Sequence, residues 1–114
     1  MELSPLTAIS PVDGRYRKYI QHLDDYFSEY ALMKYRLFVE IEYLLFLEKK
    51  KFFNLSKKTI RHLEKLSESF GPEDAQEIKQ IEFTTNQDVK AVEYFLKNEL
   101  RNYGGKEAKE WVHF

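Results

Sequence analysis

Two short segments of the chain hold residue types that bind anionic ligands. The first, "SPVDGRYRKY", covers residues 10–19. Gly14 would let the backbone bend closely around a ligand. Arg15 offers a planar guanidinium that can donate two hydrogen bonds to a phosphate, and Tyr16 adds a hydroxyl donor. An ordinary loop explains the same residues, because Asp13 and Gly14 favour a turn and Arg15 suits a position facing water. On this segment alone, the loop is the simpler interpretation.

The second segment, "TTNQDVKAVEYF", covers residues 84–95 and predicts the start of a helix. Thr85 or Asn86 can serve as the N-cap, and Asp88 suits the positive end of the helix dipole. The same helix start can hold an anionic or carbonyl-bearing ligand, because unpaired N–H groups and polar side chains gather there. A cap and a ligand site are compatible, so both interpretations stay open.

Other chemistry is absent from the sequence. The three histidines, His22, His62 and His113, are scattered and show no metal-binding spacing, so no metal site is expected. No serine nucleophile elbow, glycine-rich phosphate loop or EF-hand pattern is present. The eight tyrosines and nine phenylalanines fall at helical core spacing, which favours a core over base stacking. The residues therefore indicate binding groups without a complete catalytic set.

Composition indicates a single small globular domain. The chain has 114 residues, of which 43% are hydrophobic and 32% charged, and its formal net charge is -1. Because basic and acidic residues nearly balance, the chain has no strong electrostatic field to attract polyanions. Nucleic acid and anionic membranes are therefore not expected partners. The absence of cysteine excludes disulfides and thiolate chemistry. No signal peptide is recognisable, and the most apolar run, residues 37–47, is too short for a membrane span, so we expect a cytoplasmic protein.

One long helix is predicted from Ser28, a good N-cap, to about Phe53. Its apolar residues recur at steps of three and four: Leu32, Tyr35, Val39, Tyr43 and Phe46. Further apolar residues widen this stripe until most of the circumference is hydrophobic, which is typical of a helix packed on several sides. We therefore expect the helix to need partners beyond this chain.

Three more helices follow. The second begins after Ser56 and ends at Gly71, the third opens at Pro72 and breaks at 84–86, and the fourth runs from 88 to about 101. The inward side of the fourth is expected to hold Val89, Val92, Phe95, Leu96 and Leu100. No segment alternates like a strand, so the predicted class is all-α, a small helical domain with one long central helix.

The end of the sequence predicts a further, incomplete helix. After a loop at 102–105, the tail "KEAKEWVHF" begins a helical pattern and stops at Phe114. Trp111, Val112 and Phe114 have little left in the chain to bury them. We therefore expect a sequence cut from a longer protein.

Taken together and in this order, the segments resemble the amino-terminal portion of the adenylosuccinate lyases of the bacterial purine-synthesis type. The similarity includes residues 1–16, 27–36, 84–97 and 111–114, and it is most specific in the opening and in "TTNQDVKAVEYF". The resemblance implies the fumarase and aspartase superfamily, whose subunits have a helical first domain, a long bundle that builds a homotetramer, and a small third domain. Residues 1–114 resemble the first domain only.

The resemblance also implies a reaction. It is the β-elimination of adenylosuccinate to AMP and fumarate, with a parallel cleavage of the succinocarboxamide ribonucleotide SAICAR to AICAR, without cofactor or metal. By position, Arg15 and Tyr16 would bind the phosphate of this nucleotide substrate, while Asn86 and Asp88 would line its pocket. His113 would lie near the active site, and its simpler interpretation is a partly buried helix residue.

One position departs from the family pattern, because Gln87 stands where the family usually has histidine. Gln87 can hydrogen-bond but cannot titrate near neutral pH, so it is kept as a binding residue only. The general acid and general base of the family belong to segments beyond Phe114, so no catalytic residue is expected in this chain, which should be inactive alone.

Two other functions remain open. A free-standing helical protein-interaction module without a catalytic role is the alternative, because the helix at 28–53 carries an oversized apolar surface. Another lyase of the superfamily, of the argininosuccinate or carboxymuconate type, is disfavoured by the purine-type opening "SPVDGRY".

Overall fold

The computed structural model describes every residue from 1 to 114, and its regular structure consists of helices. This confirms the predicted all-α class. The chain forms two compact units, Met1–Ala31 and Leu32–Phe114, which are described separately. No helix is both long and apolar enough to span a membrane.

The first unit consists of turns followed by three short helical segments. These are α1 (Arg17–Ile20), the 3₁₀ segment η1 (Gln21–Leu23) and α2 (Asp24–Phe27), and sequence analysis predicted none of them. Arg17 joins them to the preceding turn, because its guanidinium lies 2.5 Å from Asp13 Oδ1 and 2.5 Å from Asp24 Oδ2. Both pairs are largely exposed, so they orient the segment more than they stabilise it.

Gly14 has a structural role inside this first unit. The expected turn is present, since the backbone N–H groups of Asp13 and Gly14 donate to Ser10 O at 3.1 and 3.0 Å. A Cβ at Gly14 would collide with the carbonyl oxygen of Pro5. The close backbone approach that glycine permits is therefore made by the chain's own backbone, and this contact explains Gly14 without a ligand.

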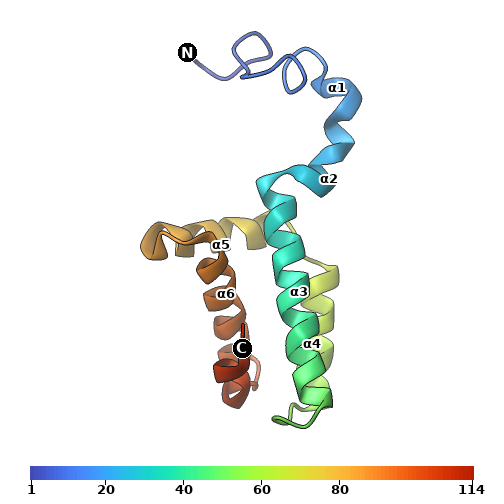
Figure 1. Cartoon of the computed structure of the whole chain (residues 1–114), viewed down its shortest axis with the longest axis vertical. Coiled ribbons are helices and arrows are strands. Elements are labelled where there is room, and N and C mark those ends of the chain that lie inside the picture. The colour runs from blue at the N-terminus through green and yellow to red at the C-terminus, as the bar shows by residue number, and fades with distance from the viewer. The chain divides into compact units, whose positions relative to one another are not determined.

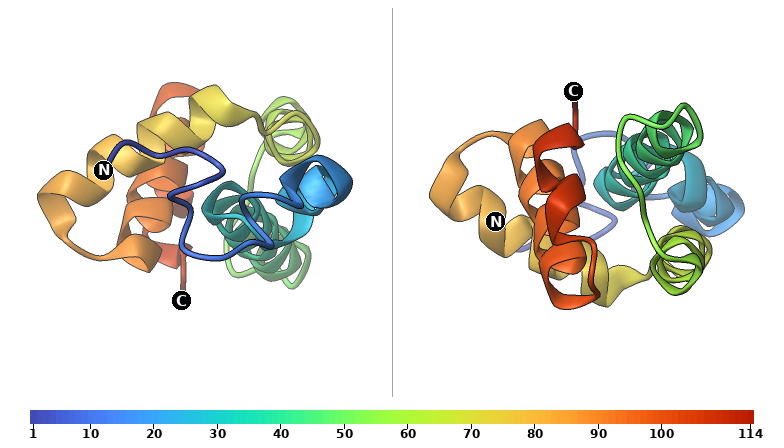
Figure 2. Two further views of the ribbon diagram at one scale, coloured as in Figure 1. Left: turned by 90° about the horizontal axis from the view of Figure 1, so that it is seen from above. Right: turned by 90° about the horizontal axis from the view of Figure 1, so that it is seen from below.

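The long helix α3 (Glu29–Lys49) begins where the sequence predicted and ends earlier than predicted. Ser28 caps it, because its hydroxyl accepts the Ala31 N–H at 3.1 Å. Lys51 takes a left-handed backbone conformation, with φ of 69°, and the chain turns there instead of continuing as a helix to Phe53. Figures 1 and 2 show the next helix, α4 (Lys57–Glu68), lying beside α3.

Helix α4 starts at the cap that the sequence predicted. The hydroxyl of Ser56 accepts the Thr59 N–H at 3.1 Å. The buried Thr59 hydroxyl then donates to Tyr103 O at 3.0 Å, and the ring of His62 stacks on that of Tyr103 with centroids 3.7 Å apart. These contacts join α4 to the end of α6, and His62 Nε2 also lies 3.0 Å from Glu99 Oε2. His62 is therefore a structural residue.

Removing this cap should weaken the fold measurably. We expect Ser56→Ala to lower the free energy of unfolding by about 1 kcal/mol, because the first turn of α4 loses its side-chain acceptor. Urea denaturation of the 114-residue chain measures the change. Ser67→Ala, inside the same helix, serves as the matched control and should have little effect. Equal stabilities for the two variants would contradict the cap.

Helices α5 (Pro72–Thr85) and α6 (Asp88–Asn102) complete the predicted set and pack against each other. α5 lies across the direction of α6 in Figure 1. The buried core is built from all four longer helices, and its fully buried large side chains include Leu37, Ile41, Leu44, Leu63, Ile78, Phe95, Leu96 and Leu100. Val89, predicted to face inward, is instead 37% exposed.

The turn between α5 and α6 differs from the prediction in its caps. Asn86 ends α5 with a left-handed φ of 57°, and Gln87 is the N-cap of α6 without a side-chain cap bond. Thr85 Oγ1 instead bonds to the backbone of Gln87, accepting its N–H at 3.3 Å and donating to its carbonyl at 3.1 Å. Neither Thr85 nor Asn86 caps α6, because both residues precede the cap position.

The tail forms a 3₁₀ segment, η2 (Lys106–Trp111), that packs against α6. Val112 is buried, and the ring centroid of Trp111 lies 5.4 Å from that of Phe52 and 5.9 Å from that of Phe53. The expectation of little burial was therefore wrong for Val112, and Trp111 is partly buried because residues of the turn after α3 pack against it. Phe114 does remain exposed.

The apolar stripe that defined α3 in the sequence is the exposed side of the helix. Its five members, Leu32, Tyr35, Val39, Tyr43 and Phe46, are between 39 and 60% exposed. The core takes the other side of α3, where Leu37, Ile41 and Leu44 are fully buried. The chain therefore carries an unpartnered apolar face along its longest helix. We call it the α3 face.

Candidate functional site

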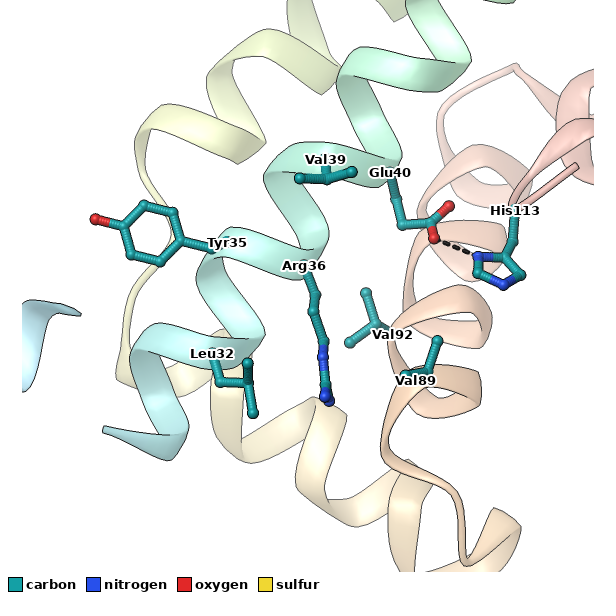
Figure 3. A pocket seen from close by; sticks show the side chains of 8 residues that line it. All are labelled: Leu32, Tyr35, Arg36, Val39, Glu40, Val89, Val92 and His113. Atoms are coloured by element: carbon teal, nitrogen blue, oxygen red, sulfur yellow. Dashed lines mark hydrogen bonds and ion pairs between the residues drawn. The ribbon is translucent and has the colours of Figure 1, made fainter. Parts of the chain in front are cut away.

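A cavity of about 350 Å³ lies between α3 and α6 within the second unit (Figure 3). Its lining is largely apolar, and the side chains of Arg36, Glu40 and His113 stand among the hydrophobic ones. The full lining is Leu32, Tyr35, Arg36, Val39, Glu40, Val89, Val92 and His113. An apolar cavity with a few convergent polar groups is the usual form of a small-molecule site.

Helix geometry places the polar groups of α3. Arg36 and Glu40 are four residues apart, so they share one side of the helix and both reach the cavity. Across the cavity, α6 contributes Val89 and Val92. His113 comes from the turn after η2 with a left-handed φ of 59°, and its ring points toward Glu40 in Figure 3.

Arg36 ties the start of α6 to α3. Its Nη1 lies 2.7 Å from Asp88 Oδ2, and Asp88 Oδ1 also accepts the Val89 N–H at 2.9 Å. The hydrogen bond from Arg36, together with the one from Val89, lowers the pKa of Asp88. Asp88 is therefore ionised at neutral pH. It is the first residue of α6, at the N-terminal end where the helix dipole favours a negative charge.

His113 is held between carboxylates from two helices. Its Nδ1 lies 2.5 Å from Glu40 Oε1 on α3, and its Nε2 lies 3.7 Å from Glu93 Oε1 on α6. The hydrogen bond to Glu40 is the main cause that raises the pKa of His113 above that of a free imidazole. The site therefore favours a positively charged imidazolium beside an apolar cavity.

The structure brings some of the expected site residues together. His113 lines the cavity, and Asp88 lies outside the lining but pairs with Arg36, which belongs to it. Asn86 and Gln87 directly precede Asp88, and their side chains are exposed. Both are thus available to a ligand at the start of α6.

Arg15 and Tyr16 belong to the first unit. Both are exposed, and the guanidinium carbon of Arg15 lies 5.5 Å from the ring centroid of Tyr16. No carboxylate pairs with Arg15, whereas Arg17 in the same unit is paired twice. Arg15 and Lys18 are therefore the cations of this segment without a carboxylate partner, and of the two only Arg15 carries a guanidinium.

Sequence reasoning missed Arg36 and Glu40. Arg36 belongs to residues 27–36, which entered only through the family resemblance, and Glu40 lies within the apolar run at residues 37–47. Their spacing of four residues, which places a cation and a carboxylate on one side of the same helix, is the signal that could have identified them.

The whole chain is similar to part of several proteins named adenylosuccinate lyase. It is 48% identical over 121 residues to the protein of Dictyostelium discoideum and 46% identical over 119 residues to that of Escherichia coli strain K12. A third, from Haemophilus influenzae, is 42% identical over 119 residues. Each alignment covers 100% of this chain and 26% of the relative, so the chain spans about a quarter of the length of the curated relatives it matches. No family model matches it.

Proposed function

Because the chain belongs to the adenylosuccinate lyase family over its whole length, we propose that it acts as the first domain of such a lyase and supplies substrate-binding residues. The lyase cleaves adenylosuccinate to AMP and fumarate, and SAICAR to AICAR and fumarate, by β-elimination. The domain comprises residues 1–114. It works in the cytoplasm, as part of a homotetramer.

The observation that carries this proposal is the cavity between α3 and α6. Of the family-matched residues, His113 lines this cavity and bonds to Glu40, while Asp88 pairs with Arg36, another residue of the lining. The cavity thus joins a surface for an uncharged part of a ligand to groups that bind charged parts. A nucleotide that carries a dicarboxylic acid has an uncharged part as well as charged groups.

The proposed binding roles follow from the chemistry of each side chain. Arg15 and Tyr16 donate to the phosphate, since the Arg15 guanidinium has no carboxylate partner. Asn86 and Gln87 offer neutral donors and acceptors at the start of α6, next to Asp88. His113 offers a charged donor. None of these groups is poised to take the proton from the succinyl carbon, so the acid and base come from the other parts of the lyase.

A chimera tests the proposed function. Residues 1–114 replace the matching quarter of the Escherichia coli relative, and fumarate release from adenylosuccinate is measured. We expect turnover by the chimera and none by the 114-residue chain alone, because the chain lacks the acid and the base. A chimera that folds and assembles like the parent enzyme but releases no fumarate would refute the proposal.

The α3 face fits the same proposal. In the assembled lyase, helices from the remaining three quarters of the polypeptide cover the part of the face outside the cavity, at Tyr43 and Phe46, because exposed apolar surface is costly in water. The alternative function, a free-standing interaction module, uses the same face for a different protein. Activity of the chimera separates the two, since an interaction module has no reason to complete a lyase.

Alone, the chain should associate through this face. We expect the 114-residue chain to self-associate with rising concentration, and Phe46→Glu to reduce the association by placing a charge on the α3 face. Sedimentation velocity measures the effect. Asn54→Glu adds the same charge at an exposed position outside the face and is the matched control. If the sedimentation coefficients of the two variants depend on concentration in the same way, the α3 face does not drive the association.

A further inference from the structure

The Glu40 side chain is unusual among the carboxylates of this chain. It is only 12% exposed, and its Oε1 lies 2.5 Å from His113 Nδ1. Its other oxygen, Oε2, is buried without a hydrogen-bond partner. A carboxylate this far from water is costly unless a positive charge stands beside it. The imidazole of His113 is the group placed to supply that charge.

The other charges around His113 are weaker or more distant. Glu93 Oε1 on α6 lies 3.7 Å from Nε2, beyond hydrogen-bond distance. Lys97, also on α6, opposes the positive charge of the ring, and Arg36 on α3 lines the same cavity. The short contact with Glu40 therefore dominates the orientation of the ring.

Neither regular structure nor deep burial holds the His113 ring in place. His113 has a φ of 59°, in the left-handed region that costs free energy for a residue with a Cβ. His113 is half exposed, and Phe114 beyond it is mostly exposed. Burial alone therefore does not hold the ring, and the hydrogen bond to Glu40 is the directional contact that does.

We propose that Glu40 is a positioning residue for His113, holding Nδ1–H against Oε1 so that Nε2–H is the donor left for a ligand. The inference rests on the proposed function for the identity of the ligand, but the Glu40–His113 pair itself does not. Glu40 would act through His113, by fixing which ring nitrogen is presented and by keeping the ring charged.

Two variants separate the charge of Glu40 from its hydrogen bond. Glu40→Gln removes the charge but retains an oxygen that can accept from Nδ1–H, whereas Glu40→Ala removes both. Glu42→Gln, at an exposed position on the same helix, is the matched control. The measurement is the ¹⁵N and ¹³C NMR titration of the His113 ring in the 114-residue chain, from about pH 5 to about pH 9.

We expect His113 to lose its proton at a lower pH in Glu40→Gln than in the parent chain, while the neutral ring keeps its proton on Nδ1. In Glu40→Ala the titration also moves down, and the preference for the Nδ1–H tautomer is lost. Glu42→Gln should leave the titration and the tautomer of His113 unchanged. An unchanged His113 titration and tautomer in Glu40→Gln and Glu40→Ala would overturn the proposal, and Glu40→Gln decides the charge effect if the alanine variant fails to fold.

The same pair predicts a pH-dependent stability. Because the pKa of His113 is raised in the folded chain, the pair's stabilisation is complete below the ordinary imidazole pKa. It is lost as the pH rises through the raised value. The difference in unfolding midpoint between the parent chain and Glu40→Gln should therefore shrink toward alkaline pH.

These readouts need no substrate, so they stand apart from the proposed function. In the chimera, Glu40→Gln should shift the alkaline limb of the kcat/KM profile to lower pH. An NMR shift together with an inactive chimera would retain the positioning role and reject the lyase assignment. An active chimera with no shift in either readout would reject the positioning role alone.

Discussion

Phe95→Ala is expected to lower the free energy of unfolding by about 3–5 kcal/mol. Phe95 is the largest fully buried side chain of the core and lies on α6. Truncation removes its buried apolar surface and leaves a cavity that the surrounding helices fill only partly. Domains of this size are stabilised by only about 5–15 kcal/mol, so the variant should lie close to unfolding.

Urea denaturation followed by circular dichroism measures this change. Phe83→Ala is the matched control, because Phe83 is the same residue type on α5 but 69% exposed. Phe83→Ala should lower the free energy of unfolding far less than Phe95→Ala does. Similar midpoints for Phe83→Ala and Phe95→Ala would show that the core is not centred on α6.

Arg15→Ala is expected to lower kcat/KM of the chimeric lyase roughly 10- to 100-fold, the scale of one charge-assisted hydrogen bond. Arg15 is exposed and has no carboxylate partner, so its guanidinium breaks no ion pair on binding a phosphate. Arg17 would be a poorer choice, because Asp13 and Asp24 already occupy its guanidinium.

Product inhibition identifies the part of the substrate that Arg15 binds. Arg15→Ala should weaken inhibition by AMP and leave inhibition by adenosine unchanged, because adenosine has no phosphate. Lys18→Ala removes an exposed cation from the same segment and controls for the loss of general positive charge. If kcat/KM and both inhibition constants are the same in Arg15→Ala and the parent chimera, the phosphate role is wrong.

Local signals in the sequence were sufficient to locate most of the helices. Ser28 and Ser56 cap α3 and α4 as expected, and Pro72 is the first residue of α5. These features were predictable because a cap or a first-turn proline acts within a few residues of itself. The short segments between 17 and 27 were missed, because they are too short to show a helical period.

The sequence also identified the residue types of the candidate site without their arrangement. Asp88 and His113 were marked from the motifs that contain them, but nothing local linked either to α3. The partners Arg36 and Glu40 became visible only when α3 lay across the cavity from α6. Contacts between residues so far apart in the chain depend on helix packing, which no local pattern specifies.

By itself the sequence determined the all-α class, the main helices and the family, because periodicity, caps and motif order are written along the chain. Only the tertiary structure decided which side of α3 is buried. The helix is apolar around most of its circumference, so its pattern could not choose between the core side at Leu37 and Ile41 and the α3 face. The choice depended on where α4, α5 and α6 could pack, and that same packing brought Glu40 to His113.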